Sequence, residues 1–194
     1  MMSRILSIIG AALLCASSYA EAYRIRAVDG LLTSWGTCSP IGEHDILTAW
    51  HVVDTGEVSV EIDGKWEKAT VVAHDGGNDL ALLRIERKMT ECVEIMEFPA
   101  IKLHASTGVV LKDEHKTAVT TPVEERRVQL SQISIDGTVG HANSGAPVTV
   151  NGAIVAMVTG IVPGPKPGTA HCVPSGIILK FLETAGWKKP EERR

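Results

Sequence analysis

Dipeptides that favour tight hairpin turns recur along this chain between segments suited to β-strands. Asp63-Gly64 lies between alternating segments of VSVEIDGKWEKATVVAHD, and Asn151-Gly152 lies between two apolar runs of VTVNGAIVAMVTG. Asp-Gly and Asn-Gly supply the positive φ angles of a two-residue hairpin. A further Asp-Gly pair lies in SQISIDGTVG. These turns predict an antiparallel, all-β body.

Helical periodicity occurs only near the C-terminus. DILTAWHVV and NDLALLRIE are predicted as buried strands. After Pro174, apolar residues share one face of a predicted helix, namely Ile177, Ile178, Phe181 and Leu182. We expect Ser175 to cap this helix and Gly186 to end it. The sequence therefore predicts a β body closed by one C-terminal helix.

The composition is that of a globular protein with one sizeable domain or two small subdomains. Of the 194 residues, 44% are hydrophobic, and the formal net charge is −4 with a pI near 6.0. No long basic run is present, so neither nucleic acid nor an anionic membrane is expected as a partner. The polar stretch around residues 86–108 is the expected seam between subdomains, and IVPGPKPGTAH is an expected exposed loop.

The first residues have the pattern of a secretory signal peptide. Arg4 precedes the apolar run Ile5–Cys15, and small residues end the segment near Ala22. The apolar run is too short for a comfortable membrane span. We expect cleavage near Ala22 and export to the periplasm or the outside. A lipid anchor on Cys15 is less favoured, because Leu14 stands where a small residue is usually required.

Removal of the leader leaves three cysteines, Cys38, Cys92 and Cys172. An odd count allows at most one internal disulfide, and the sequence alone does not pair them. A chain with so few cysteines is not a disulfide scaffold.

Three short motifs each place a residue of catalytic type at the edge of a predicted strand. His51 follows an apolar strand, Asp79 precedes one, and Ser144 lies in the tight turn GHANSGAPV. Each residue alone is more often a turn former or a structural side chain. All three together, in the order His, Asp, Ser, favour a catalytic triad.

The chemistry of acyl transfer explains why these residue types are needed together. A serine hydroxyl is a weak nucleophile at neutral pH, so His51 would take the proton of Ser144 and return it to the leaving amine. A carboxylate must fix the tautomer of the imidazole and stabilise its positive charge. Asp79 would have this role.

On these residues the chain resembles the trypsin-like serine proteases of the chymotrypsin fold, most closely the protease domain of the HtrA group. The resemblance rests on ILTAWHVV, NDLALLRI, NSGAPV and CVPSGIILKFL. It implies two six-stranded antiparallel β-barrels and a C-terminal α-helix, with His and Asp from the first barrel and Ser from the second. The implied protease domain covers residues 23–186, with barrels at about 23–95 and 105–175, a helix at about 175–185 and a charged tail at 187–194.

The resemblance also assigns an oxyanion hole, made by the backbone N–H groups of Ala142 and Ser144. The family usually has glycine two residues before the serine, where this chain has Ala142. Glycine tolerates conformations that cost alanine roughly 1 kcal/mol or more. We therefore expect this hole to be strained, or collapsed until substrate binds. Ala146, where the family usually has a second glycine, is a milder change.

Expectations for the substrate pocket also come from the resemblance. Thr138 stands where trypsins carry the aspartate that attracts basic side chains, so a preference for Lys or Arg is not expected. His141 would lie near the pocket rim. Met157, Val158 and Thr159 would form another wall, and their bulk suggests small or medium apolar side chains in the substrate.

Two alternatives remain open from the sequence. A pseudoprotease would keep the fold as a peptide-binding module, with Ala142 marking an impaired oxyanion hole. A metal-dependent hydrolase is disfavoured because no H-E-x-x-H or paired Cys/His spacing occurs. We expect no cofactor and no metal, and protein or peptide substrates as partners. Capture of substrates by a PDZ domain, usual in HtrA proteins, is not expected, because the sequence ends soon after Gly186.

Overall fold

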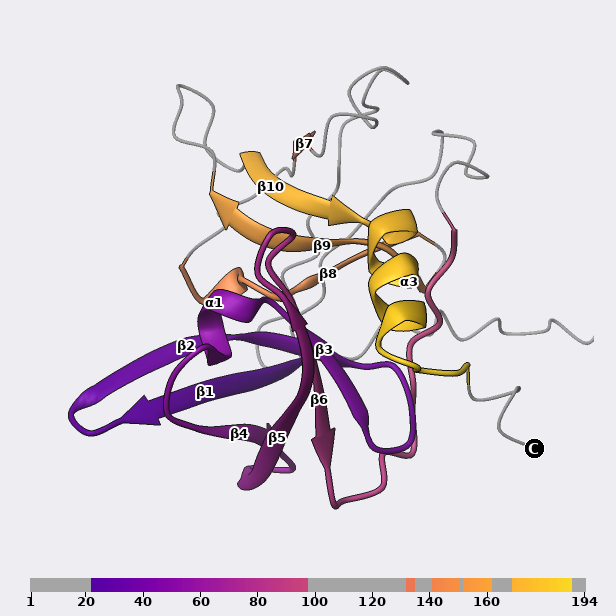
Figure 1. Ribbon diagram of the computed structural model, residues 1–194. Helices are drawn as coiled ribbons and strands as arrows, with labels where there is room; N and C mark the ends of the chain where they lie inside the picture. Colours follow the sequence, from indigo (N-terminus) through magenta and orange to yellow (C-terminus); the bar gives the residue numbers. More distant parts are fainter. Residues whose placement is uncertain (1–21, 98–131, 135–140, 151, 162–168, 190–194) are drawn as a thin grey trace, which may run out of the picture.

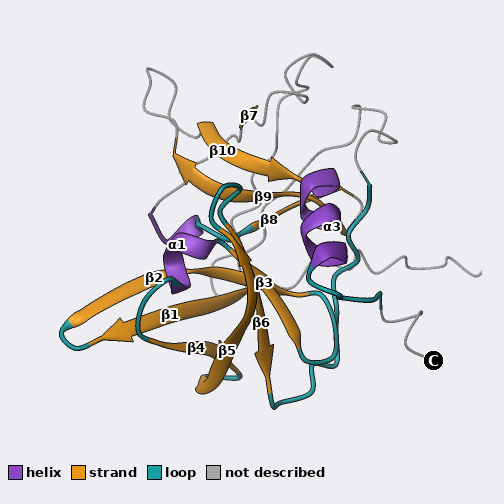
Figure 2. Ribbon diagram, viewed as in Figure 1, coloured by secondary structure: helices purple, strands orange, loops and turns teal. Residues whose placement is uncertain are grey.

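The computed structural model describes residues 22–97, 132–134, 141–150, 152–161 and 169–189. A closed β-barrel forms one end of the molecule, and a second sheet lies beyond it with a helix alongside (Figures 1 and 2). The mainly β architecture with a C-terminal helix, predicted from the sequence, is confirmed.

The barrel contains six antiparallel strands in the order β1-β2-β3-β6-β5-β4. Its strands are β1 (Tyr23–Asp29), β2 (Leu32–Pro40), β3 (Asp45–Thr48), β4 (Glu57–Ile62), β5 (Lys65–Asp75) and β6 (Leu80–Ile85). Burial alternates along β1 and β4, whose inward side chains fill the barrel, while β3 and β6 are buried along almost their whole length.

The Asp63-Gly64 turn joins neighbouring strands as predicted, and so does the Asn151-Gly152 turn, of which Asn151 lies outside the described residues. Asp63 and Gly64 have φ angles of 51° and 74° and connect β4 to β5 with Ile62 opposite Lys65. Gly152 has a φ of 82° and precedes β9. The positive φ angles are those of the two-residue hairpins that the dipeptides favour.

The second sheet has the described order β7-β10-β9-β8. Its strands are β7 (Gln132–Ser134), β8 (Pro147–Val150), β9 (Ala153–Ile161) and β10 (Thr169–Pro174). The other strands of the predicted second barrel, the Asp136-Gly137 turn and most of the proline-rich loop lie outside the described residues. The predicted domain boundaries also fall partly there and stay a prediction.

The C-terminal helix α3 (Ser175–Thr184) carries the predicted apolar face and ends as predicted. Gly186 has a φ of 73°, its N–H donates to the Glu183 carbonyl, and the Trp187 N–H donates to the Leu182 carbonyl. This is a Schellman ending, which needs a glycine-like conformation after the helix. The predicted cap is wrong: Ser175 is buried as the first helical residue, and Pro174, which has no side-chain donor or acceptor, precedes it.

A short extended segment ties the barrel to the second sheet. The Val93 N–H donates to the Pro40 carbonyl of β2, while the Ile154 N–H of β9 donates to Glu94 and the Ile154 carbonyl accepts from Met96. One buried apolar cluster also runs from the barrel interior into β9 and α3. The two sheets therefore share a core, which fixes side chains at their junction.

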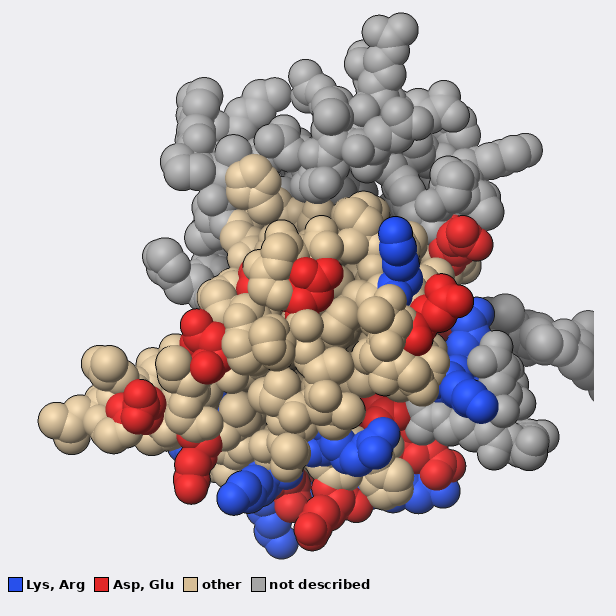
Figure 3. Space-filling model, viewed as in Figure 1, with Lys and Arg blue, Asp and Glu red and all other residues tan. Residues whose placement is uncertain are grey.

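None of the three described cysteines forms a disulfide; Cys38 and Cys172 are buried and Cys92 is exposed. Burial raises the pKa of the Cys38 thiol far above its ordinary range. Acidic and basic side chains are interspersed over the barrel face in Figure 3. No helix of the described residues is long and apolar enough to cross a membrane.

Candidate active site

His51 and Asp79 form a tightly bonded pair at the edge of the barrel. The Nδ1 atom of His51 lies 2.7 Å from Oδ2 of Asp79, and the backbone N–H of His51 donates to Oδ1 at 2.8 Å. Because an ionised carboxylate only accepts hydrogen bonds, Nδ1 carries the proton. The pair therefore leaves Nε2 of the imidazole as the group that can accept a proton.

His51 lies on a single helical turn and not on a strand. The predicted strand DILTAWHVV ends at Thr48, and α1 (Trp50–Val53) follows. Val52 and Val53 are buried under this turn, while the His51 side chain is about half exposed. The apolar residues that suggested a longer strand instead anchor the helical turn, which presents His51 outward.

Asp79 holds its carboxylate in place through an unusual backbone conformation. Its φ is 56°, which lies in the left-handed region and is disfavoured for residues other than glycine. Its carbonyl accepts the N–H of Trp50 at 3.2 Å. Three hydrogen bonds thus fasten Asp79 to the segment that carries His51.

The hydrogen bond that His51 donates to Asp79 raises the pKa of His51 above its ordinary value of 6.5. Partial burial of the ring opposes this rise, while the charges of Asp79 and Asp54 add to it. An imidazole with a raised pKa is a stronger base, as proton abstraction from a hydroxyl requires.

Ser144 lies in a turn of the second sheet that packs against the first barrel. Its carbonyl accepts the N–H of Thr37 on β2 at 2.8 Å, and the next residue, Gly145, donates its N–H to the Val158 carbonyl at 2.7 Å. Ser144 itself is only 8% exposed. The turn is therefore clamped between β2 and β9.

Thr37 and Thr48 extend this clamp, and sequence reasoning missed both. The Thr37 hydroxyl donates to the Ala142 carbonyl at 2.8 Å, and the Thr48 hydroxyl donates to the Thr37 carbonyl at 2.7 Å. Both threonines are buried. Gly36 next to Thr37 was the available signal, because a glycine inside a strand often marks a close backbone approach.

The same packing brings the serine turn next to the helical turn of His51. A methyl group on Gly36 would lie 2.9 Å from the Ser144 carbonyl oxygen and 2.8 Å from the Val52 side chain. A methyl group on Gly145 would lie 3.1 Å from the backbone nitrogen of Ala49. Among the described contacts, no hydrogen bond joins the His51 ring to the Ser144 hydroxyl. Such bonds commonly tighten only when substrate binds.

The segment before Ser144 forms a 3₁₀ turn, η1 (His141–Asn143). A 3₁₀ turn bonds each N–H to the carbonyl three residues earlier, which directs the Ser144 N–H back toward the His141 carbonyl. Ala142 has no positive φ, so this conformation carries no left-handed strain at the alanine, and the alternative expectation of a hole that is collapsed until substrate binds stays a prediction. The turn uses right-handed dihedral angles, which alanine adopts easily. Presenting the Ser144 N–H to a substrate oxygen therefore requires the turn to open.

The predicted pocket residues are only partly described. Thr138 lies outside the described residues, and of His141 only the backbone is described. Met157 and Val158 are each 1% exposed, while Thr159 is half-buried and its hydroxyl donates to the His171 carbonyl at 3.3 Å. The roles of these residues in a pocket stay predictions. Within the described part of the chain, no three His, Cys, Asp or Glu side chains gather as a metal site.

Comparisons with known proteins agree with this geometry. A protease from M. tuberculosis, Rv3671c in its active form, matches with a TM-score of 0.69 at 22% identity, covering 90% of this chain and 85% of that one. The inactive form of Rv3671c gives a TM-score of 0.64 at 22% identity, covering 88% of this chain and 89% of that one. A serine endoprotease from Yersinia pestis gives 0.69 at 16% identity, covering 87% of this chain and 64% of that one. These likenesses show a shared fold. Comparison with curated proteins gave no match.

The model of one protein family matches this sequence over more than half of its length. That family is described as a trypsin-like peptidase domain, and the match spans residues 36–157. The matched segment contains the His51–Asp79 pair and the Ser144 turn. The chain therefore belongs to the trypsin-like peptidase family, as its sequence motifs predicted.

Proposed function

We propose that this serine endopeptidase cleaves peptide bonds through an acyl-enzyme, with Ser144 as nucleophile, His51 as general base and Asp79 as the group that orients His51. The observation that carries the proposal is the 2.7 Å bond between His51 and Asp79 at the barrel edge against which the Ser144 turn packs. The family match supplies the activity class.

The geometry supports a definite division of roles. With Nδ1 donating to Asp79, Nε2 of His51 accepts the Ser144 proton as the hydroxyl attacks the scissile carbonyl. The resulting imidazolium faces a carboxylate that stabilises its charge, and it then protonates the leaving amine. A water molecule, deprotonated by His51, then attacks the acyl carbonyl and releases the acyl group from Ser144, which regains its proton from His51.

Strand β9 offers an edge on which an extended peptide can lie. The Val158 N–H and carbonyl bond to Ala146 and Gly145, and the pairing of β8 with β9 ends at Pro147 opposite Met157. Beyond Val158, this side of β9 has no strand partner in the described residues. A substrate strand added there would be held by main-chain hydrogen bonds beside Ser144.

One observation favours a second candidate, a catalytically impaired protein that keeps the fold as a peptide-binding module. The 3₁₀ turn over His141–Asn143 directs the Ser144 N–H away from a substrate oxygen. Each oxyanion donor is worth on the order of 3 kcal/mol in the transition state. A turn that never opened would leave the triad without this stabilisation.

Export completes the proposal, and it rests on the leader of the sequence. Arg4, the apolar run Ile5–Cys15 and the small residues near Ala22 match a cleaved signal peptide. The first barrel strand begins at Tyr23, directly after the expected cleavage site. Mass spectrometry of the exported protein should find a mature N-terminus near Tyr23; an intact leader would contradict export by this route.

The decisive experiment is labelling with a fluorophosphonate probe, followed by cleavage-site profiling on a peptide library. The folded protein should be labelled, and Ser144→Ala should not be. Profiling should show no preference for Lys or Arg, in keeping with Thr138. A folded protein that binds peptides but resists the probe at every pH tested would favour the second candidate.

A further inference from the structure

A closed turn of four residues stands directly before Asp79. Asp75, the last residue of β5, accepts the N–H groups of Gly77 and Asn78 on Oδ1 at 3.0 and 3.1 Å. Its Oδ2 accepts the side-chain amide of Asn78 at 2.7 Å. One carboxylate therefore fixes three donors, and these bonds set the direction in which the chain enters Asp79.

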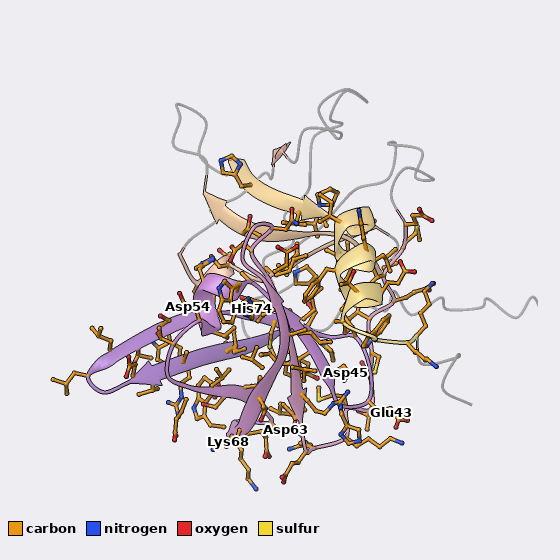
Figure 4. The ribbon with its side chains drawn as sticks, in the orientation of Figure 1. Glu43, Asp45, Asp54, Asp63, Lys68 and His74 are labelled. Atoms are coloured by element: carbon orange, nitrogen blue, oxygen red, sulfur yellow. The ribbon has the colours of Figure 1, made fainter. Side chains whose placement is uncertain are left out.

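Asp79 needs such support because its conformation is intrinsically unfavourable. The left-handed region is less favourable than the right-handed one even for aspartate, which enters it more readily than most residues, as Asp63 does in its turn. A residue stays there where its surroundings support it. On the far side of Asp79, Trp50 donates its N–H to the Asp79 carbonyl. The Trp50 ring stacks on His74, next to Asp75, with centroids 3.9 Å apart and planes 11° from parallel. Figure 4 shows His74 beside α1.

We propose that Asp75 is a positioning residue whose carboxylate, by closing the turn 75–78, holds Asp79 in the left-handed conformation that aims it at His51. The inference rests on the proposed function, in which Asp79 orients the base. Asp75 touches neither the His51 ring nor Ser144 in the described contacts, so it acts through Asp79.

The Asn78 amide keeps Asp75 in its accepting form. The hydrogen bond from this amide lowers the pKa of Asp75 below its ordinary value, and the N–H groups of Asn78 and Gly77 lower it further. At neutral pH the carboxylate is ionised and all three bonds can form.

Charge and geometry must be separated in any test, because Asp75 is itself an anion near the base. The elements packed against α1 are β1, β2, β5 and β6. The ionisable residues of these strands are Tyr23, Arg24, Arg26 and Asp29 on β1, Cys38 on β2, Lys65, Glu67, Lys68, His74 and Asp75 on β5, and Arg84 on β6, with Asp54 and Asp79 in the adjoining turns. Of these, Asp79 and Asp54 raise the pKa of His51. The guanidinium groups of Arg24 and Arg26 lie over the Trp66 ring.

The test compares Asp75→Ala with the conservative Asp75→Asn. Asparagine loses the charge but keeps an oxygen that can accept the two backbone N–H groups, as in other Asx turns. Asp63→Asn is the matched control, because Asp63 is also an acidic turn residue but lies at the other end of the barrel (Figure 4). For Asp75→Ala, kcat should fall about tenfold to a hundredfold with KM little changed, because Asp79 no longer aligns the base.

The pH dependence supplies a readout that a merely structural role would not move. In Asp75→Ala the acid limb of kcat/KM should shift to lower pH, because a misaligned Asp79 no longer raises the pKa of His51. NMR titration of the His51 ring, assigned by its loss in His51→Ala, should show the same shift. Asp75→Asn should restore most of both effects, and Asp63→Asn should match the parent protein.

Several outcomes would overturn the proposal. Equal shifts in Asp75→Ala and Asp75→Asn would mean that charge alone acts, and no shift in either would remove any role. If Asp75→Ala does not fold, the test uses Asn78→Ala, which deletes only the 2.7 Å bond between Asn78 and Asp75. This variant should shift the His51 titration in the same direction by a smaller amount. An unchanged His51 titration in Asn78→Ala would also refute the proposal. If the parent protein neither cleaves peptides nor reacts with a fluorophosphonate, the proposed function fails, while the NMR titration still decides the role of Asp75.

Discussion

Gly145, directly after the proposed nucleophile, is the position where a single methyl group should do most damage. Its φ is 86°, and an added Cβ would lie 2.0 Å from the Thr37 carbonyl oxygen and 2.5 Å from the Thr48 hydroxyl. Both are held by other hydrogen bonds within the barrel, so neither can move aside freely. The substitution Gly145→Ala therefore combines a disfavoured backbone conformation with a collision.

The destabilisation can be estimated from these two causes. A left-handed alanine costs about 1–2 kcal/mol. Forcing a methyl group into a filled site costs typically about 1–3 kcal/mol. Alanine has less conformational entropy than glycine in the unfolded chain, which offsets about 0.4–1 kcal/mol of this destabilisation. Gly145→Ala should thus lower the free energy of unfolding by about 1–4.6 kcal/mol, with a central value of about 3 kcal/mol. A displacement of Ser144 by about 1 Å should reduce kcat/KM about a hundredfold.

Gly64→Ala is the matched control for the backbone term alone. Gly64 has a φ of 74°, and no atom lies within 4 Å of an added Cβ. It joins β4 to β5, away from the serine turn. Gly64→Ala should lower the free energy of unfolding by at most about 1.6 kcal/mol and leave activity unchanged.

Urea unfolding followed by tryptophan fluorescence measures the stability of both variants, and the rate of fluorophosphonate labelling measures the reactivity of Ser144. The difference between the two variants isolates the collision. If Gly145→Ala were as stable and as reactive as Gly64→Ala, the serine turn would not be clamped against β2, and the assembly of the site described above would be wrong.

Three further predictions concern the base, the clamp and the oxyanion donor. Because Asp79 raises the pKa of His51 above 6.5, kcat/KM should fall as the pH drops through that raised pKa. The ion pair of protonated His51 with Asp79 should stabilise the fold fully below about pH 6.5, and this stabilisation should be lost as the pH rises through the raised pKa. A rate profile with its acid limb below 6.5 would contradict the pairing. Thr37→Val should lower the free energy of unfolding by about 1–3 kcal/mol and slow fluorophosphonate labelling of Ser144, because it leaves the Ala142 carbonyl without its hydrogen-bond donor. Thr33→Val, at an exposed position of β2, is the control and should change neither. Ala142→Gly should raise kcat/KM up to about tenfold in a peptide assay, because glycine enters the left-handed region at about 1–2 kcal/mol less cost than alanine; an unchanged or lower rate would show that the donor forms without that conformation.

Local signals in the sequence predicted those parts of the fold that depend on local chemistry. Asp63-Gly64 specifies its own backbone dihedral angles, so the β4–β5 hairpin followed from two residues. Gly186 likewise predicted the end of α3, because the Schellman ending requires a positive φ. The turn between β1 and β2 shows the limit of this rule: its two residues are Gly30 and Leu31, because Asp29 pairs with Leu32, so reading Asp29-Gly30 as the turn would shift the register by one residue.

Other features depend on contacts between distant segments, and the sequence carries only weak signals for them. The segment WHVV has the apolar character of a strand but forms a helical turn, because Val52 and Val53 pack down while the Asp79 carboxylate accepts the His51 N–H. Thr37 reads as an ordinary strand residue; its role depends on the Ser144 turn, which is more than a hundred residues away in the sequence. Tertiary packing overrides local preference in both places.

The two halves of the candidate site differ in how far the fold has prepared them for chemistry. On the first barrel, Asp79 is held in a strained conformation by its neighbours, so the base is oriented before substrate arrives. On the second sheet, Ala142 lies in an unstrained 3₁₀ turn, and on the proposed mechanism this turn opens before the N–H groups stabilise an oxyanion. The free energy needed to open this turn would then come from contacts between the substrate and the edge of β9. Peptides that make few contacts with this edge would therefore be cleaved more slowly. On the proposed mechanism, Ala142 in this turn therefore predicts faster cleavage of long, extended peptides than of short ones.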